Sequence, residues 1–354
     1  MDGHPDDTLS TGQIFRYQFR VNNRAVTYWY HPHPIHHTAS QVYKGLEGMI
    51  LIRDTTEQKL HLPKKEREIP LIIQDKRSIG TSLNYTVSHH EIIWGMLGDY
   101  MCVNGVHKVF RSVGTTSFRL RTLNGSNPRI YDLALTHALP FTLIGTDCGL
   151  LDQSDSIDSL TLAPSERADV LVNFSQQKIN TVVDLIDKNN NDRRLLQFLI
   201  EKKLDDDFTL PKKLSTLEKI APETAIKTRK FQLSSRGMMG MKSIHRINGK
   251  TYDPKRVDER VKANTVEIWE FDNTAGSFDH PMHLHGVQFQ ILERIAGRNR
   301  LLPTELGYKD TFLFKTGEKV KIIIPFGDQK GRYVFHCHTL EHENDGMMLQ
   351  YEIT

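Results

Sequence analysis

The sequence has few cysteines, little net charge and no long apolar run. Three cysteines in 354 residues are too few and too scattered for a disulfide scaffold. No apolar run approaches the roughly 18 residues of a membrane-spanning helix. Lysine and arginine (46) nearly balance aspartate and glutamate (43) without a basic block, which argues against a dedicated nucleic-acid binder. The acidic N-terminus, MDGHPDDTLS, lacks the apolar core of a signal peptide, so the chain as given is expected to stay in the cytoplasm.

Long helical periodicity is also missing, and the main pattern is the alternation typical of half-buried strands. Apolar and polar residues alternate over 14–21, 117–121, 170–174 and 320–324. Turn signals such as Asn104-Gly105 separate these runs. Many short strands punctuated in this way predict an all-β fold of sandwiches or barrels. Only short helices are expected, near residues 38–45 and 339–345.

One charged stretch divides the chain. Residues 206–228 hold two prolines and no alternation, and we interpret them as an inter-domain linker. A weaker boundary near residue 65 leaves a first segment of 1–65, a second domain of 66–205 and a third of 229–354. The second and third domains are each large enough for one β-sandwich, whereas the first is too short to close one alone.

Histidine is the residue that is unusually distributed. Of 17 histidines, ten fall in the three windows 31–37, 280–285 and 336–342, where even spacing would place about one. Packing does not explain such clustering, whereas metal ligation does. The isolated histidines, including His245, are interpreted as ordinary surface or core residues. Cys102 and Cys148 lack nearby ligand partners and are predicted to be small buried residues.

The segment HCHTLEHENDGMM, which begins at His336, is the most specific of these patterns. Cys337, His342 and Met347 supply a thiolate, an imidazole and a thioether. A second imidazole from elsewhere completes the ligand set of an electron-transfer copper site. On a strand, His336 and His338 point away from Cys337 because side chains alternate faces. The two faces therefore predict two metal sites that are joined by a few covalent bonds.

The other two windows supply the remaining imidazoles. HPMHLHG holds His280, His283 and His285, which give one imidazole to the cysteine site and two to a second cluster. In HPHPIHH, His31 and His33 share a face if they lie in a strand, so they can bind neighbouring metals.

With these motifs, the sequence resembles the multicopper oxidases, and within them the bacterial laccase-like enzymes of three cupredoxin domains. The resemblance runs along the whole chain. YHPHPIHHTASQVYKGLEGMILIRD is similar to the second copper motif and its helix, and LAPSERADVLVNF is similar to a second-domain landmark. The resemblance implies cupredoxin-like Greek-key β-sandwiches, with two complete domains and a truncated first one.

The resemblance also implies a mechanism and a set of ligands. In the family, a type 1 copper takes electrons from a reducing substrate, and a trinuclear cluster of type 2 and type 3 coppers reduces O₂ to water. By position, the type 1 ligands are His280, Cys337, His342 and Met347. The type 3 pair takes His31, His33, His285, His336 and His338, and the type 2 copper takes His283. Two acids also match: Glu343 as a proton-relay carboxylate near the type 3 coppers, and Asp2 beside the type 2 copper.

The chain departs from the family pattern at its start. The family's first HxH motif, which supplies one type 2 and one type 3 ligand, is absent before the DG segment at Asp2. Three interpretations are open. The true protein is longer than this chain, or other groups complete the cluster, or the chain is a remnant with an incomplete trinuclear site. Candidates for replacement ligands are His4, His36 and His37. A truncated first domain would leave strand edges and apolar surface, so a homo-oligomer that covers them is expected.

The main functional hypothesis is a laccase-like oxidase that couples the oxidation of phenolic or similar small substrates to O₂ reduction. One alternative is a non-enzymatic copper-binding or electron-transfer protein. Another is a cuprous oxidase of copper tolerance, for which Met238, Met239 and Met241 would supply soft ligands. Family relatives are usually periplasmic or exported, so the location stays open between export and the cytoplasm.

Overall fold

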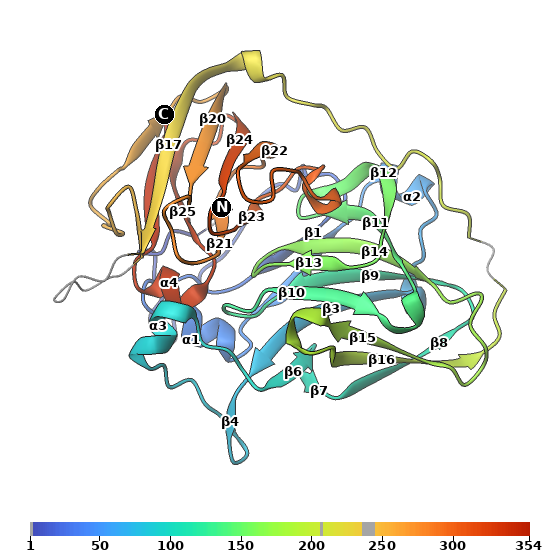
Figure 1. Ribbon diagram of the computed structural model, residues 1–354. Coiled ribbons are helices and arrows are strands. Elements are labelled where there is room, and N and C mark those ends of the chain that lie inside the picture. Colours follow the sequence, from blue (N-terminus) through green and yellow to red (C-terminus); the bar gives the residue numbers. More distant parts are fainter. Residues whose placement is uncertain (1–2, 206–207, 236–244) are drawn as a thin grey trace.

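The alternating apolar residues form strands that are arranged in several sheets. The computed structural model describes residues 3–205, 208–235 and 245–354. Figure 1 shows two groups of sheets that meet near the short helices α1, α3 and α4. This architecture confirms the all-β prediction. The helices span Thr38–Tyr43 (α1), Thr55–Lys59 (α2), His89–Trp94 (α3) and Leu340–Asn344 (α4).

The N-terminal part forms a two-stranded antiparallel ribbon. β1 (Val26–Tyr30) pairs with β2 (Gly48–Ile52), and Tyr30 lies opposite Gly48. The connection between the two strands carries α1 and the first histidine window. The ribbon is tied to the middle of the chain because the indole Nε1 of Trp29 donates to Ser165 Oγ at 3.2 Å.

The middle of the chain forms two sheets with a common core. The smaller sheet has the strand order β13 (Leu160–Leu162), β10 (Tyr131–Leu135), β15 (Val182–Asp187), β16 (Arg193–Lys202), β8 (Val109–Gly114). The larger has the order β12 (Gly149–Ile157), β11 (Phe141–Thr146), β14 (Arg167–Asn173), β9 (Ser117–Asn124), β3 (Glu68–Lys76), β6 (Tyr100–Val103), β7 (Val106–His107). Buried residues of both sheets, such as Val170 and Phe198, form one hydrophobic cluster. A small hairpin joins β4 (Ser78–Ile79) to β5 (Ser82–Leu83).

The C-terminal part repeats this arrangement. One sheet has the order β18 (His245–Ile247), β17 (Ala225–Ser235), β20 (Thr265–Asp272), β24 (Lys319–Phe326), β22 (Gln290–Ile295). The other has the order β19 (Glu259–Val261), β26 (Met348–Ile353), β25 (Gly331–Cys337), β21 (His280–Leu284), β23 (Thr311–Phe314). Their shared core is rich in aromatic side chains and includes Trp269, Phe335, Cys337 and Met347. The sulfur-bearing residues of the predicted copper site therefore lie inside a hydrophobic core.

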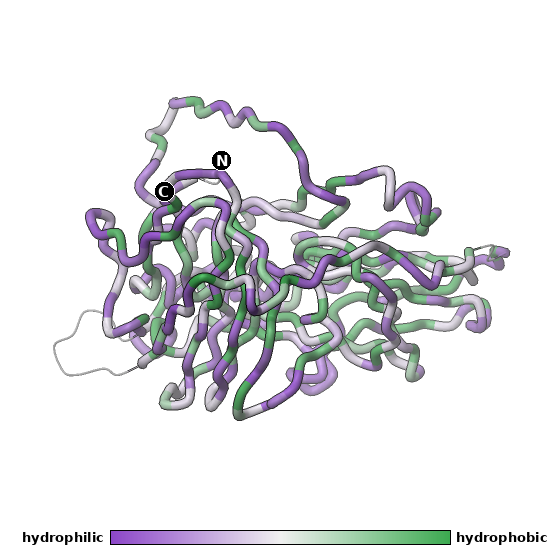
Figure 2. The backbone as a smooth tube through the Cα atoms, turned by 90° about the horizontal axis from the view of Figure 1, so that it is seen from above, coloured by the Kyte–Doolittle hydropathy of each residue, from purple (hydrophilic) through white to green (hydrophobic). Residues whose placement is uncertain are grey.

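A long connection joins the two groups of sheets. In Figure 1 it is the yellow segment that runs around the outside of the molecule to β17, and Figure 2 shows that hydrophilic and hydrophobic residues are mixed along the outer parts of the chain. Leu214 anchors it, because this side chain is buried and its amide donates to the Asp152 carbonyl at 2.8 Å. The predicted linker range 206–228 is too long at its end, since β17 already begins at Ala225 and pairs in parallel with β20. The division into three domains stays a prediction.

The strand predicted over residues 14–21 is wrong. This segment has no regular structure, and Ile14 is 94% exposed. Alternation becomes a strand only where another strand supplies hydrogen bonds, and no segment among the described residues pairs with it. The other three predicted runs lie in β9, β14 and β24. In the described parts of the chain, no helix is long and apolar enough to cross a membrane.

Candidate metal centre

The first cluster of ligand-type side chains surrounds Cys337. His280 begins β21, Cys337 ends β25, and His342 lies on α4. The Cys337 sulfur lies 3.4 Å from Nδ1 of His280 and 3.6 Å from Nδ1 of His342. All three side chains are buried. Two nitrogens and one sulfur thus face a common point, and these are the equatorial donors that a type 1 copper takes.

The protonation states of this cluster suit a metal cation. Burial lowers the pKa of His280 to about 3, so its imidazole is neutral at pH 7. Nε2 of His342 donates to the Ile93 carbonyl at 3.0 Å, which leaves the lone pair of this ring on Nδ1, toward the sulfur. Burial raises the pKa of the Cys337 thiol to about 12. A thiolate here therefore requires a bound cation, and metal binding deprotonates such a thiol.

Met347 is placed beside this cluster by backbone contacts. The amide of Cys337 donates to the Met347 carbonyl at 3.1 Å, and the amide of Met347 donates to the His342 carbonyl at 2.9 Å. The Met347 side chain is fully buried in the same hydrophobic core as Cys337. The thioether is thus available as the weak axial ligand that accompanies a His₂Cys set.

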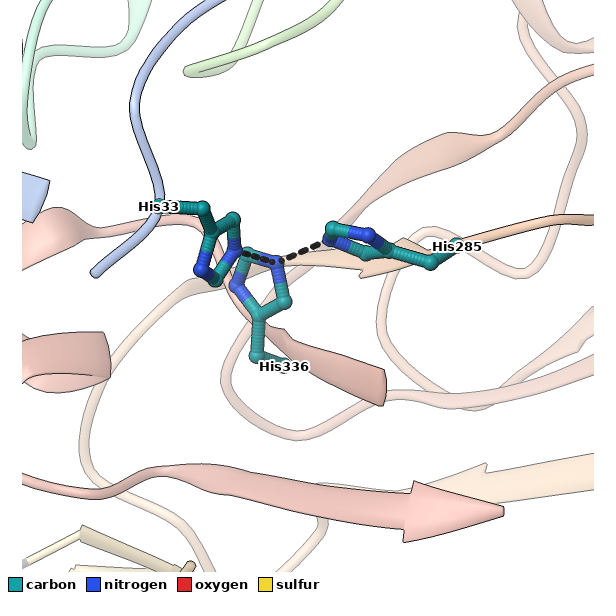
Figure 3. Close-up of side chains that lie close together, drawn as sticks. All are labelled: His33, His285 and His336. Carbon is teal, nitrogen blue, oxygen red and sulfur yellow. Dashed lines mark hydrogen bonds between the residues drawn. The ribbon is translucent and has the colours of Figure 1, made fainter. Parts of the chain in front are cut away.

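A second cluster consists of imidazoles alone. Figure 3 shows His33, His285 and His336 pointing at one another, and the Nε2 of His336 lies 3.2 Å from that of His33 and 3.1 Å from that of His285. Nδ1 of His336 lies 3.0 Å from the Cys337 carbonyl, which can only accept, so the Nε2 of this ring carries a lone pair. A cation bound among these three Nε2 atoms would interact with all of them at once.

Three further histidines lie around this group. The ring centroid of His338 is 5.4 Å from that of His31 and 5.8 Å from that of His283. Both ring nitrogens of His338 are buried without a hydrogen-bond partner. Unpartnered buried nitrogens are costly in a protein, whereas metal ligation removes the cost. Burial also lowers the pKa of His338 well below its usual range, which keeps the ring neutral and able to bind a metal.

His336 and His338 flank Cys337 in the chain, so the two clusters are connected through covalent bonds. The prediction that the flanking rings turn away from Cys337 agrees with these contacts. His31 and His33 come together differently from what was expected. β1 ends at Tyr30, so both lie in the loop after the strand, with their ring centroids 5.6 Å apart.

Of the two predicted acids, Glu343 lies at the imidazole cluster. Its Oε1 is 3.6 Å from Nδ1 of His33, and its Oε2 is 3.7 Å from Nδ1 of His336. Burial raises the pKa of Glu343 to about 8. The neighbouring Glu341 faces elsewhere and accepts hydrogen bonds from Tyr85 (3.0 Å) and Asn127 (2.7 Å). Asp2 lies outside the described residues.

The candidates for replacement ligands do not join either cluster. Nε2 of His4 lies 2.8 Å from the Gln350 side-chain oxygen, and Nδ1 of His36 donates to the Asn344 carbonyl at 2.7 Å. His36 has a φ of 65°, a conformation that favours glycine. His37 is exposed. Among the described residues, the groups that bring three ligand atoms together are His33, His285 and His336, and His280, Cys337 and His342.

Sequence reasoning missed two residues that contact the cysteine site. His245 is fully buried and its ring stacks on His342, with centroids 3.7 Å apart. Nε2 of His245 also donates to the Ile93 carbonyl, at 3.1 Å. Ile93, on α3, thus holds both rings through its backbone. Nothing in the sequence signals this contact, because any residue at position 93 supplies a carbonyl.

Comparisons with known proteins identify the family. Two family profiles, both described as multicopper oxidase, match residues 1–57 and 223–354. A multicopper oxidase of Staphylococcus haemolyticus is 34% identical over 358 residues, which cover 100% of this chain and 74% of that protein. The laccase of Bacillus subtilis is 33% identical over 399 residues, which cover 100% of this chain and 77% of that protein.

A solved structure agrees with these relatives. The 2F4 variant of the McoA multicopper oxidase from Aquifex aeolicus has a TM-score of 0.90 and 34% identity, covering 100% of this chain and 81% of that one. The buried, neutral imidazoles and the Cys337 thiol fit copper, the metal that this family uses. The chain belongs to the multicopper oxidase family, whose laccase-like members are copper-dependent oxidoreductases with oxygen as the acceptor.

Proposed function

We propose that this protein is a laccase-like oxidase that takes single electrons from phenolic or similar small reductants and delivers them to O₂. In this proposal, the type 1 copper is held by His280, Cys337, His342 and Met347. The type 3 pair is held by His31, His33, His285, His336 and His338, and the type 2 copper by His283. Bound copper supplies the electron-accepting and oxygen-reducing chemistry.

One observation carries the proposal: the sequence His336-Cys337-His338 touches both clusters. The Cys337 sulfur faces His280 and His342, while the His336 ring faces His33 and His285. An electron that arrives at the sulfur therefore has a short covalent path to the imidazole cluster. A protein that only stored copper would not need two unlike ligand sets on one continuous strand.

The surrounding side chains have separate tasks. The hydrophobic core around Cys337 excludes water from the sulfur and keeps the local dielectric low. Glu343 holds a proton within 4 Å of His33 and His336, where oxygen reduction consumes protons. We therefore assign Glu343 as the proton donor of the cluster, as a general acid must lie close to the reacting group.

The substrate class rests on the relatives, three of which are named laccases. Met238, Met239 and Met241, which would favour cuprous ions, lie outside the described residues. Phenolic donors are therefore the first substrates to test.

The test is oxygen uptake by the copper-loaded protein with a simple phenol. We expect sustained uptake that Cys337→Ser abolishes together with the blue absorption near 600 nm. Cys102→Ser is the matched control, because Cys102 is also a buried free cysteine but lies outside both clusters. A blue protein that consumes no oxygen would contradict the proposal and favour a non-enzymatic electron-transfer protein.

A further inference from the structure

Two short segments, distant in the sequence, pair residue by residue next to His283. Lys309 Nζ lies 3.1 Å from Glu166 Oε1, and Thr311 Oγ1 donates to Ser165 Oγ at 3.3 Å. Between them, the Arg167 guanidinium donates to both carboxylate oxygens of Asp310, at 2.7 and 2.6 Å. We call this set the clamp; its members are Ser165, Glu166, Arg167, Lys309, Asp310 and Thr311.

The residues of the clamp are buried, and their charged and hydroxyl groups are paired with one another. Each of its six residues is at most 8% exposed. Asp147 adds a third carboxylate, because its Oδ2 lies 2.9 Å from Lys309 Nζ and its Oδ1 accepts from the Arg167 amide at 2.7 Å. Two cations thus face three carboxylates. Buried ion pairs of this kind add little net stability but define one geometry, because every alternative leaves a charge unpaired.

The clamp also reaches the ribbon at the N-terminus. Ser165 Oγ accepts from the indole of Trp29, whose ring centroid lies 4.3 Å from that of His31. Ser165 has a φ of 74°, which is a strained conformation for serine. Strain of this kind persists only where the surroundings fix the residue, and it concentrates at functional sites.

His283 is the histidine that the clamp holds. It lies directly opposite Thr311 in the pairing of β21 with β23. Nδ1 of His283 lies 2.9 Å from the Asp310 backbone carbonyl and 3.0 Å from Thr311 Oγ1. The carbonyl oxygen has no hydrogen, so Nδ1 must be the donor. In a neutral imidazole the lone pair then lies on Nε2.

We propose that the clamp positions His283 and fixes its tautomer, so that Nε2 is presented to the metal. The inference rests on the assignment of His283 as a ligand. Thr311 is the positioning residue that contacts the ring. Arg167 and Asp310 act through the backbone, because their bidentate pair fixes the carbonyl that accepts from Nδ1. Groups that orient a ligating histidine in this way typically change metal affinity by about 10- to 100-fold when they are removed.

The first experiment measures copper binding with Thr311→Val, which removes the hydroxyl and keeps the shape. We expect the non-blue mononuclear Cu(II) signal in electron paramagnetic resonance to be lost at about 10-fold lower chelator concentration. The blue absorption of the cysteine site should stay unchanged and serves as the internal control for folding. Thr311→Ser, which restores the hydroxyl, should recover the original chelator resistance.

Thr122→Val is the matched control. Thr122 is also buried and donates its hydroxyl hydrogen to a backbone carbonyl, that of Ala168, at 2.8 Å, but it lies in β9 and is not one of the clamp residues. If this variant weakened the non-blue copper as much as Thr311→Val, the effect would be general loosening and the proposal would be overturned. An unchanged chelator resistance in Thr311→Val would overturn it too.

A second experiment uses the metal-free protein and therefore does not depend on the proposed activity. Nitrogen NMR of histidine-labelled apoprotein, assigned with His283→Gln, reports which ring nitrogen carries the hydrogen. We expect His283 to be protonated at Nδ1 in the original protein and also in Thr311→Val, because the Asp310 carbonyl remains as the acceptor. A His283 ring protonated at Nε2 would contradict the inference even if the enzyme is active. Failure to consume oxygen with the expected tautomer would contradict only the proposed function.

Discussion

At the residue scale, the two clusters differ in which ring nitrogen faces the centre. Nδ1 of His31, His283 and His336 donates to a backbone carbonyl, of Pro32, Asp310 and Cys337 respectively, so these rings offer Nε2. The His342 ring has the opposite tautomer, because its Nε2 donates to the Ile93 carbonyl and its Nδ1 faces the Cys337 sulfur. Fixed tautomers lower the reorganisation that metal binding would otherwise require.

Replacement of Glu343 tests the proton donor. Glu343→Gln keeps the volume but cannot deliver a proton, so we expect oxygen turnover to fall by about 10²-fold or more while the blue absorption is retained. The measurement is the steady-state rate with a saturating phenol. Glu341→Gln, which replaces the other acid of α4 near the site, is the control. Its oxygen turnover should fall much less, because Glu341 faces Tyr85 and Asn127. Equal losses in both variants would contradict the assignment.

The ligand-type residues could be predicted from sequence because their chemistry is rare. A cysteine between two histidines, followed by His342 and Met347 at short fixed spacings, has few structural explanations. His245 and Ser165 could not be predicted in the same way. A lone histidine is usually an ordinary residue, and a serine becomes significant only when the fold sets it against Thr311 and Trp29.

At the scale of elements, the site is built where strands end. His280 opens β21, Cys337 closes β25, and the first histidine loop follows β1. Strand ends can present side chains from several sheets to one point while the cores behind them stay rigid. The helix α3 adds the carbonyl of Ile93 from the other side of the cysteine cluster.

Gly95, which ends α3, should tolerate no side chain. Its φ is 82°, and a Cβ there would lie 2.2 Å from the Cβ of Pro128. We expect Gly95→Ala to lose about 1–3 kcal/mol of unfolding free energy through overpacking, in addition to the backbone strain. The displaced α3 should also shift the blue absorption, because Ile93 orients His342. Chemical denaturation and the visible spectrum measure the two effects.

Gly105→Ala is the control for Gly95→Ala. Gly105 has a similar φ of 79° but open space around its Cα, so its substitution adds only the backbone strain. Equal destabilisation in the two variants, with unchanged spectra, would show that α3 does not act on the site.

The strands were predictable where a sheet partner exists. The alternation at 320–324 agrees with β24, where Val320, Ile322 and Ile324 are buried, and β24 pairs with β20. The alternation at 14–21 is equally regular, yet no described strand pairs with it. Local pattern encodes the preference for a strand, whereas the sheet partner is a long-range property that the pattern does not contain.

At the scale of the whole molecule, the centre is assembled from three distant parts of the chain. The N-terminal loop brings His31 and His33, the C-terminal part brings the other proposed ligands, and the middle of the chain brings the clamp residues 165–167. The sequence predicted the first two contributions from histidine spacing. The third is encoded in common polar residues, and their role becomes visible only in the folded structure.

Self-association is the prediction that belongs to this scale. Apolar side chains along the N-terminal segment are exposed, with Ile14 at 94%, Tyr17 at 58% and Phe19 at 60%. Exposed apolar patches of this kind typically mark interaction surfaces. We expect light scattering to show a dimer or larger species at micromolar concentration, and Ile14→Ser with Phe19→Ser to shift it toward the monomer. A monodisperse monomer in the unchanged protein would contradict this prediction.

The central claim is that electrons pass from the Cys337 site to the imidazole cluster within one chain. The most direct measurement is to reduce the copper-loaded protein without oxygen, mix it with O₂ and follow the absorption near 600 nm. The account predicts rapid return of the blue colour, and much slower return in His285→Ala, which keeps the cysteine site but removes a cluster ligand. Equally slow return in both proteins would mean that oxygen is not reduced at the cluster.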